Sequence, residues 1–154
     1  IDVISAQEMY DASLAAAEGC DLFIAAAAVA DYRPEQIAAH KLKKGAADSI
    51  TLTLVKNPDI VASIAALTHK PFTVGFAAES EKLLEYGRAK LERKNLDMVI
   101  ANNISDAHIG FNSDDNAVTI IDKNSTQELS QRSKQQLARE LIALLARKII
   151  TTIK

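Results

Sequence analysis

The chain alternates between segments typical of strands and segments typical of helices. Its strongest strand signal is the apolar run "DLFIAAAAV" at 21–29, whose unbroken character predicts a strand buried on both faces. Strands that alternate with helices predict a mainly parallel sheet with helices on both faces. We therefore expect a Rossmann-like α/β fold.

The other elements follow from local signals in chain order. Ser5 is expected to cap a helix, with Glu8 completing a capping box, and Asn57 and Pro58 to start another helix as N-cap and first residue. The first half is expected to contain a strand at 1–5, the helix after Ser5, the strand at 21–29, a long loop at 32–48, a strand at 49–56 and a helix from Asn57 to about Leu67. The second half is expected to contain a strand at 72–78, a helix at 81–94, a strand at 96–102, a polar loop at 103–115, a strand at 116–122 and a long helix from Ser133. This last helix should present Leu137, Leu141, Leu144 and Leu145 on one face.

Size and charge narrow the class of protein. The 154 residues suit one domain, and a net charge of −2 gives no general surface for nucleic acid or membrane. No apolar run reaches 18 residues, and the single cysteine, Cys20, favours a reducing, cytoplasmic setting. The chain begins at Ile1 inside an expected strand, which predicts that it is truncated at its N-terminus.

Ligands of such sheets bind beyond the carboxyl ends of the strands, so the residues there are candidates for a site. The alanines at 25–28 would let a planar ligand approach the backbone; alternatively, they face tightly packed helices. Asp31 follows this strand and could accept hydrogen bonds from a ribose or help to hold a metal. The alternative for Asp31 is a turn or a helix cap.

Two segments further along carry candidate phosphate contacts. Lys41, Lys43 and Lys44 lie on the long loop, where a flexible cation could close over a substrate, or they form a solvated basic tip. The segment "NPDIV" at 57–61 opens a helix whose free amides could bind an anion. Asp59 in that first turn already complements the positive end of the helix.

The next strand and helix add an aromatic residue and two cations. Phe76 could stack on a base or belong to the core. Lys90 and Lys94 are four residues apart and share a helix face, which suggests a shared anion; alternatively, they complement the helix C-terminus. In a regular crossover this helix end lies at the opposite sheet edge, so a role in the site requires an unusual placement or a contribution across a subunit boundary.

No pattern in the sequence points to covalent or metal chemistry. The three histidines lack metal-ligand spacing with the cysteine, and the five glycines form neither G-x-G-x-x-G nor a P-loop. There is no G-x-S-x-G element, so we expect no covalent nucleophile, and no metal ligand is assigned. The polar segment at 101–118 could bind a polar substrate or form turns.

Six motifs together resemble one family in their order along the chain. They are "AAAVADYRP", "KLKK", "LVKNPDIV", "GFAAES", "RKNLDMVIANN" and "GFNSDDNAVTII". The ordered set resembles phosphopantothenate–cysteine ligase, also called phosphopantothenoylcysteine synthetase, the C-terminal half of a bacterial bifunctional coenzyme A biosynthesis protein. The resemblance covers nearly all of 1–150, so 1–154 is expected to be this ligase domain without the glycine-rich segment that precedes it in the family.

The resemblance implies a reaction. CTP with Mg²⁺ would activate the carboxylate of 4'-phosphopantothenate as an acyl-cytidylate, and the amine of L-cysteine would then displace CMP. No protein nucleophile is needed, so catalysis would depend on positioning and charge stabilisation. The family also implies a homodimer and, in the full-length protein, a possible fusion to a flavin-dependent decarboxylase domain.

The resemblance also assigns residues. Lys41 is the implied catalytic lysine, and the implied nucleotide contacts are Ala25, Ala26, Ala27, Asp31, Lys41, Pro58, Asp59, Ile60, Val61, Phe76, Lys90 and Lys94. Because the upstream segment supplies an asparagine that handles the intermediate in the family, a chain without it is expected to be inactive alone. Two alternatives are a non-catalytic nucleotide-binding or dimerisation module and a fragment of a nucleotide-dependent dehydrogenase.

Overall fold

The computed structural model describes residues 1–43, 48–79, 81–103 and 113–152. Its elements, in chain order, are α1 (Ala6–Ala17), β1 (Leu22–Ala25), β2 (Tyr32–Pro34), β3 (Leu54–Lys56), α2 (Ile60–Ala65), β4 (Phe72–Glu79), α3 (Leu83–Arg93), β5 (Met98–Asn103), β6 (Asp115–Asp122), β7 (Thr126–Ser133) and α4 (Lys134–Thr152).

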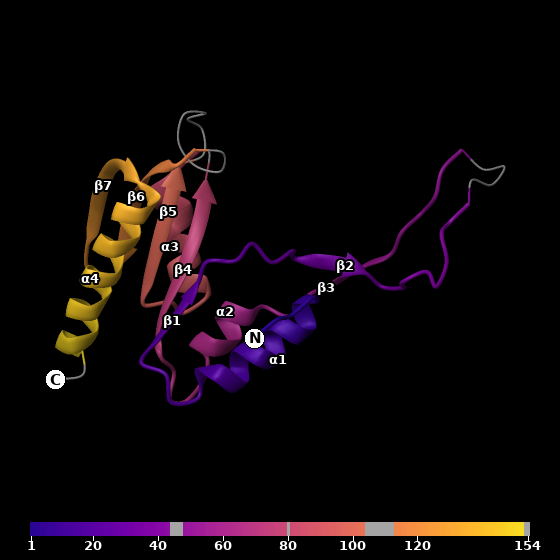
Figure 1. Cartoon of the computed structure of the whole chain (residues 1–154), viewed down its shortest axis with the longest axis horizontal. Coiled ribbons are helices and arrows are strands. Elements are labelled where there is room, and N and C mark those ends of the chain that lie inside the picture. Colours follow the sequence, from indigo (N-terminus) through magenta and orange to yellow (C-terminus); the bar gives the residue numbers. More distant parts are fainter. Residues whose placement is uncertain (44–47, 80, 104–112, 153–154) are drawn as a thin grey trace.

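Five strands form the main sheet, in the order β1-β4-β5-β6-β7 (Figure 1). β1, β4 and β5 run parallel. Beyond β5, β6 pairs antiparallel with β5, and β7 pairs antiparallel with β6. The expected Rossmann-like α/β fold is therefore confirmed, with an antiparallel extension. β7 was not predicted, because "TQELSQRS" is polar and carries no apolar strand pattern.

Helices cover both faces of this sheet, and side chains alternate between the faces along each strand. One face packs against α4 through Val74, Met98, Ile100, Val118, Ile120, Leu137, Leu141 and Leu145. The other packs against α2 and α3 through Val61, Ala65, Ala77, Leu91, Leu96, Val99, Ala101 and Ile121. The predicted apolar face of the last helix is confirmed, since Leu144 also packs against the first cluster.

The N-terminal segment differs from the prediction in one element and agrees in the next. Residues 1–4 form no strand, and Ile1 and Ile4 are 98% and 99% exposed, because they pair with no other described segment. The capping box is confirmed: Glu8 N donates to Ser5 Oγ over 3.1 Å, and Ser5 N donates to Glu8 Oε2 over 3.2 Å. α1 then packs beside α2 through Ala17, Ile60 and Ile64.

The apolar run at 21–29 is shorter as a strand than its composition predicts. β1 ends at Ala25, and all four of its residues are only half-buried. Burial on both faces was the wrong expectation, because β1 is an edge strand that pairs with β4 alone. Ala26, Ala27 and Ala28 lie beyond the strand and are exposed.

The predicted loop at 32–48 and strand at 49–56 are both partly wrong. Tyr32–Pro34 pairs antiparallel with Leu54–Lys56, so β2 and β3 form a short ribbon at the base of a long arm. We call the described residues 35–43 and 48–53 the arm; it extends away from the helices and the main sheet (Figure 1). All its described residues are exposed, so "ITLTL" at 50–54 alternates in sequence without a face to bury.

The helix after the ribbon begins two residues later than predicted. Asp59, not Asn57, is its N-cap: Ala62 N donates to Asp59 Oδ1 over 3.2 Å. Asn57 instead bridges segments, because its Nδ2 donates to Ala30 O over 2.8 Å and its Oδ1 accepts from Arg33. Most of the predicted polar loop at 103–115 falls outside the described residues.

Candidate functional site

At the carboxyl edge of the sheet, β1 ends before its neighbour β4. The pairing of β1 with β4 ends at Ala25 opposite Gly75, while β4 continues to Glu79 beside β5. The residues that directly follow β1 are Ala26, Ala27 and Ala28, and all three are exposed. Because these alanines are exposed in the described part of the chain, a flat ligand has access to the backbone here.

A half-buried lysine reaches this edge from α3. Lys90 Nζ donates to the main-chain oxygen of Phe76 over 2.6 Å, one residue beyond the last β1–β4 pair. Burial of the ammonium group lowers the pKa of Lys90, and the nearby positive charge of Lys94 lowers it further. Lys90 is thus a partly desolvated cation at the strand edge, despite its place late in the helix.

Lys94, one turn further along, reaches the start of α2. Its Nζ lies 3.0 Å from Asp59 Oδ2 and 3.2 Å from Asp59 Oδ1. The Lys94 side chain is 19% exposed and that of Asp59 is 47% exposed, so the pair lies at the boundary between core and solvent. The same carboxylate caps α2, which means that Asp59 already fills the helix end proposed as an anion site.

Contacts among the other predicted residues draw them to the same region. Ile60 and Val61 are buried, and Pro58 is half-buried. The half-buried side chain of Phe76 instead packs on the opposite face of the sheet, against the cluster that contacts α4, which favours the core alternative for this residue. Val61 belongs to the cluster against which Ala25 packs. β1, β4, α2 and α3 therefore bring together most of the predicted nucleotide contacts, in spite of the topological objection to the lysine pair.

Asp31 lies next to this region, on the path from β1 into the arm. Its main-chain oxygen accepts from Asn57 N over 2.8 Å, and its side chain is exposed. Arg33 donates to Lys56 O over 2.8 Å and to Asn57 Oδ1 over 3.1 Å, which locks the base of the arm. Sequence reasoning missed the roles of Arg33 and Asn57; a cation within the strand-like "DYRP" was the available signal.

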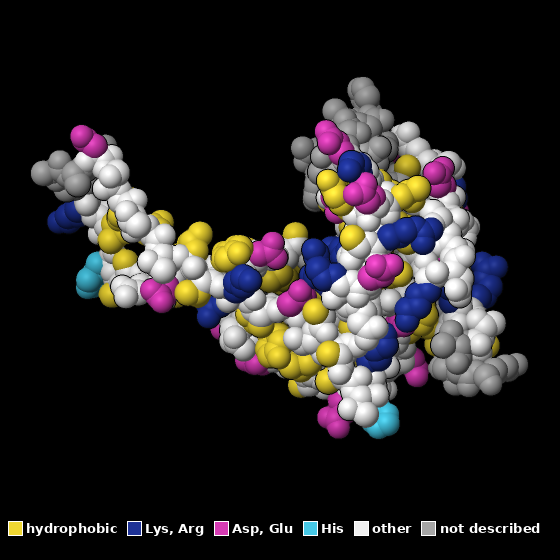
Figure 2. Space-filling model, turned by 180° about the vertical axis from the view of Figure 1, so that it is seen from behind, with side chains coloured by type: hydrophobic (Ala, Val, Ile, Leu, Met, Phe, Trp, Pro, Cys, Tyr) yellow, Lys and Arg dark blue, Asp and Glu magenta, His cyan; other side chains and the backbone are white. Residues whose placement is uncertain are grey.

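The structure does not bring Lys41 to the other predicted residues. Lys41 is exposed on the arm, which points away from the sheet (Figure 1). Lys43 is exposed on the same arm, and Lys44 falls outside the described residues. Figure 2 shows Lys and Arg side chains interspersed with Asp and Glu side chains where the arm meets the rest of the chain.

An amide pair occupies the far side of the same edge. Asn116 at the start of β6 is buried, and its Nδ2 donates to Asn102 Oδ1 near the end of β5 over 3.3 Å. The Asn116 side-chain oxygen accepts from Ala117 N over 2.9 Å. The polar character predicted for 101–118 is therefore partly engaged in internal hydrogen bonds.

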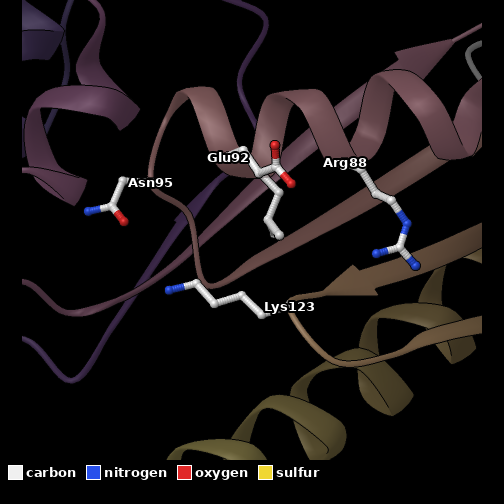
Figure 3. A pocket seen from close by; sticks show the side chains of 5 residues that line it. Arg88, Glu92, Asn95 and Lys123 are labelled. Carbon is white, nitrogen blue, oxygen red and sulfur yellow. The ribbon is translucent and has the colours of Figure 1, made fainter.

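Two surface pockets lie away from these residues. One is lined by Arg88, Leu91, Glu92, Asn95 and Lys123, between α3 and the β6–β7 turn (Figure 3). The other is lined by Cys20, Asp21, Lys70, Pro71, Phe72, Asp97 and Ile149. Neither contains a residue predicted to bind the nucleotide, so the candidate site is defined by convergent side chains at an open edge.

Metal-binding clusters and membrane-spanning helices are both absent from the described ranges, 1–43, 48–79, 81–103 and 113–152. Within them, no group of three or more His, Cys, Asp or Glu side chains could hold a metal ion. No helix in the same part of the chain is long and apolar enough to cross a membrane.

The sheet, its open carboxyl edge and the lysines near it define a Rossmann-like α/β domain with a candidate site at that edge. The chain belongs to the family described as the DNA/pantothenate metabolism flavoprotein C-terminal domain, whose model matches residues 1–149. This family membership agrees with the order of motifs in the sequence.

Curated relatives cover most of this chain. The chain is 61% identical over 122 residues to the coenzyme A biosynthesis bifunctional protein CoaBC of Vibrio parahaemolyticus, covering 78% of this chain and 31% of that protein. It is 50% identical over 121 residues to the CoaBC of Escherichia coli strain K12, covering 77% of this chain and 30% of that protein. The chain thus matches about a third of the length of these relatives.

Two solved structures share the fold. The crystal structure of the C-terminal domain of CoaBC superposes with a TM-score of 0.78 at 29% identity, covering 98% of this chain and 66% of that one. A DNA/pantothenate metabolism flavoprotein from Streptococcus pneumoniae gives a TM-score of 0.75 at 19% identity, covering 96% of this chain and 72% of that one. The second likeness bears on the fold alone.

Proposed function

We propose that this domain catalyses the CTP-dependent ligation of 4'-phosphopantothenate to L-cysteine, through an acyl-cytidylate, in coenzyme A biosynthesis. The family match and the names of the CoaBC relatives support this assignment. The structural observation that supports it is that Lys90 reaches the main chain of Phe76, one residue past the last β1–β4 pair, with Lys94 one turn further along the same helix.

Each group has a proposed task in binding CTP. Ala25, Ala26 and Ala27 leave room for the nucleotide beside the backbone, and Phe76 offers an aromatic face for the base. Lys90 and Lys94 neutralise phosphate charge, and Asp31 accepts hydrogen bonds from the ribose. The main chain of the segment formed by Pro58, Asp59, Ile60 and Val61 contacts the nucleotide from the start of α2.

Catalysis in this proposal needs no covalent nucleophile on the protein. The carboxylate oxygen of phosphopantothenate attacks the α-phosphorus of CTP, and pyrophosphate leaves. The cysteine amine then attacks the acyl carbon, and CMP leaves with the bonding electrons. Lys41 stabilises the negative charge that develops during the first step. Mg²⁺ is the proposed companion of CTP and would neutralise phosphate charge when bound.

The position of Lys41 bears on the proposed homodimer. Within one chain the arm leads this lysine away from Lys90 and Lys94. The arm also exposes large apolar side chains: Ile37, Leu42, Ile50 and Leu52 are each more than 60% exposed. Exposed apolar side chains on an extended segment favour burial against another surface. We propose that a second copy of the chain, in a homodimer, buries these side chains. The proposed location of the enzyme is the cytoplasm.

Pyrophosphate release tests the proposal. The assay uses the full-length protein with CTP, phosphopantothenate and Mg²⁺, and it should detect pyrophosphate in step with substrate. A Lys41→Gln variant should fold normally and lose turnover by at least about 100-fold, since one charge-stabilising group is worth that much. Lys123→Gln, which removes a lysine outside the site, should leave turnover unchanged.

Three outcomes would contradict the proposal. Normal turnover in Lys41→Gln would remove the catalytic role of that lysine. Nucleotide binding without pyrophosphate release from any nucleoside triphosphate would instead favour a non-catalytic binding or dimerisation module. Hydride transfer with a nicotinamide cofactor would identify a dehydrogenase.

A further inference from the structure

We propose that Asp59 is a positioning residue that acts as the internal counter-ion of Lys94, so that an incoming phosphate competes with the Asp59 carboxylate for this lysine. The inference rests on the proposed function, because it concerns the same phosphate contacts. Its consequence is that Asp59 weakens nucleotide and pyrophosphate binding and speeds their release.

The first support is the geometry of the pair. Lys94 Nζ contacts both carboxylate oxygens of Asp59, at 3.0 and 3.2 Å. The second oxygen also accepts from Ala62 N, so the cap of α2 fixes the carboxylate in place. A fixed carboxylate directs the flexible lysine toward the start of α2 and the sheet edge, and reduces its freedom to turn into solvent.

The second support is the placement of two cations side by side. Lys90 is held at Phe76 O, and Lys94 is the charged group that most lowers the pKa of Lys90. The charges of Glu79 and Asp59 act in the opposite direction. Asp59 therefore offsets repulsion within a lysine pair that an anion would otherwise offset. A bound triphosphate and Asp59 serve the same cations.

The third support is the exposure of the two partners. Lys94 is 19% exposed, whereas Asp59 is 47% exposed. The carboxylate can rehydrate easily when a phosphate takes its place, but the lysine would lose a partner in a partly desolvated position if neither anion were present. The exchange is thus inexpensive, and the expected effect of Asp59 on affinity is modest.

The N-cap role allows the charge to be removed without removing the cap. Asn and Ser are as suitable as Asp at an N-cap, so Asp59→Asn and Asp59→Ser retain the hydrogen bond to Ala62 N. Glu85→Gln is the matched control. It deletes one carboxylate from the exposed Lys82–Glu85 pair on α3, at 3.2 Å, and changes the net charge equally.

The test measures binding of inorganic triphosphate and of CTP by calorimetry, and steady-state pyrophosphate release, on the full-length protein. Asp59→Asn and Asp59→Ser should bind triphosphate about two- to fivefold more tightly than the wild type. They should also lower both KM for CTP and kcat if release limits turnover. Lys94→Gln should weaken binding, and Asp59→Asn should add no tightening in a Lys94→Gln background. Glu85→Gln should match the wild type.

The two failures can be told apart. If Lys94→Gln weakens triphosphate binding but folded Asp59→Asn and Asp59→Ser bind no more tightly than the wild type, the counter-ion role is wrong and the phosphate site stands. If the wild type binds no triphosphate, or Lys94→Gln binds it equally well, the phosphate site of the proposed function fails together with this inference.

Discussion

The carboxylate of Asp122 accepts several hydrogen bonds at the β6–β7 turn. Burial alone would raise the pKa of Asp122, but hydrogen bonds from Lys148, the main chain and hydroxyl of Ser125, and the main chain of Asn124 lower the pKa to about 2. These bonds tie the β6–β7 turn to α4. Asp122 is thus expected to contribute to stability at neutral pH.

This contribution has a defined pH window. The pKa of Asp122 in the fold lies below its ordinary value of 3.8, so its stabilisation is present above about pH 4 and is lost as pH falls toward 2. We expect Asp122→Asn to cost about 2 kcal/mol of unfolding free energy at pH 7 and much less at pH 2. Urea unfolding at several pH values measures this; an equal loss at pH 7 and pH 2 would contradict it.

Of the two helix starts predicted from capping residues, one was placed correctly and the other was not. The Ser5–Glu8 capping box was predicted because both partners lie within one helical turn. The second helix start was misplaced because Asn57 and Asp59 are both good N-caps, and only the tertiary bonds of Asn57 to Ala30 and Arg33 decide between them. A local pattern cannot contain a partner that lies more than 20 residues away.

At the scale of elements, α3 depends on a close approach to the sheet. A Cβ atom added at Gly87 would lie 2.4 Å from Ile121 Cδ1, which is too close for any side chain. Gly87 therefore lets α3, which carries Lys90 and Lys94, pack against β6. The position of both lysines at the candidate site follows from this contact.

The contact predicts a coupled pair of substitutions. Gly87→Ala should lower the unfolding free energy by about 1 kcal/mol, because overpacking outweighs the gain in helix propensity. Ile121→Val removes the Cδ1 methyl group, so Gly87→Ala should cost less, or stabilise, in that background. Chemical denaturation of the four proteins gives the coupling; additive effects would show that the close approach does not limit α3.

Strand elements were predictable where they have an apolar pattern and a partner on each side. β4, β5 and β6 meet both conditions, and the predictions at 72–78, 96–102 and 116–122 are confirmed. β1 was predicted too long because its alanines continue past the last partner on β4. β7 was missed because its polar residues pair at an edge, where burial does not select apolar side chains.

At the scale of the whole molecule, parallel strands brought distant motifs to one edge, as the sequence predicts for this fold. Lys90 reaches the main chain of Phe76, beside the last pair of β1 and β4, and Lys94 reaches Asp59 at the start of α2. The direction of the arm could not be predicted from the sequence. Its described residues are exposed, so no buried contact fixes where the arm points. Lys41 consequently remains the residue whose proposed role depends most on a second chain.

The most direct test of the proposed site is to map where CTP contacts the folded protein. We predict that titration of the ¹⁵N-labelled protein with CTP shifts the backbone amide signals of Ala26, Ala27 and Phe76, and leaves those of Arg88 and Lys123 in the pocket of Figure 3 unchanged. Shifts confined to Arg88 and Lys123, with Ala26, Ala27 and Phe76 unaffected at saturating CTP, would contradict a nucleotide site at the open sheet edge.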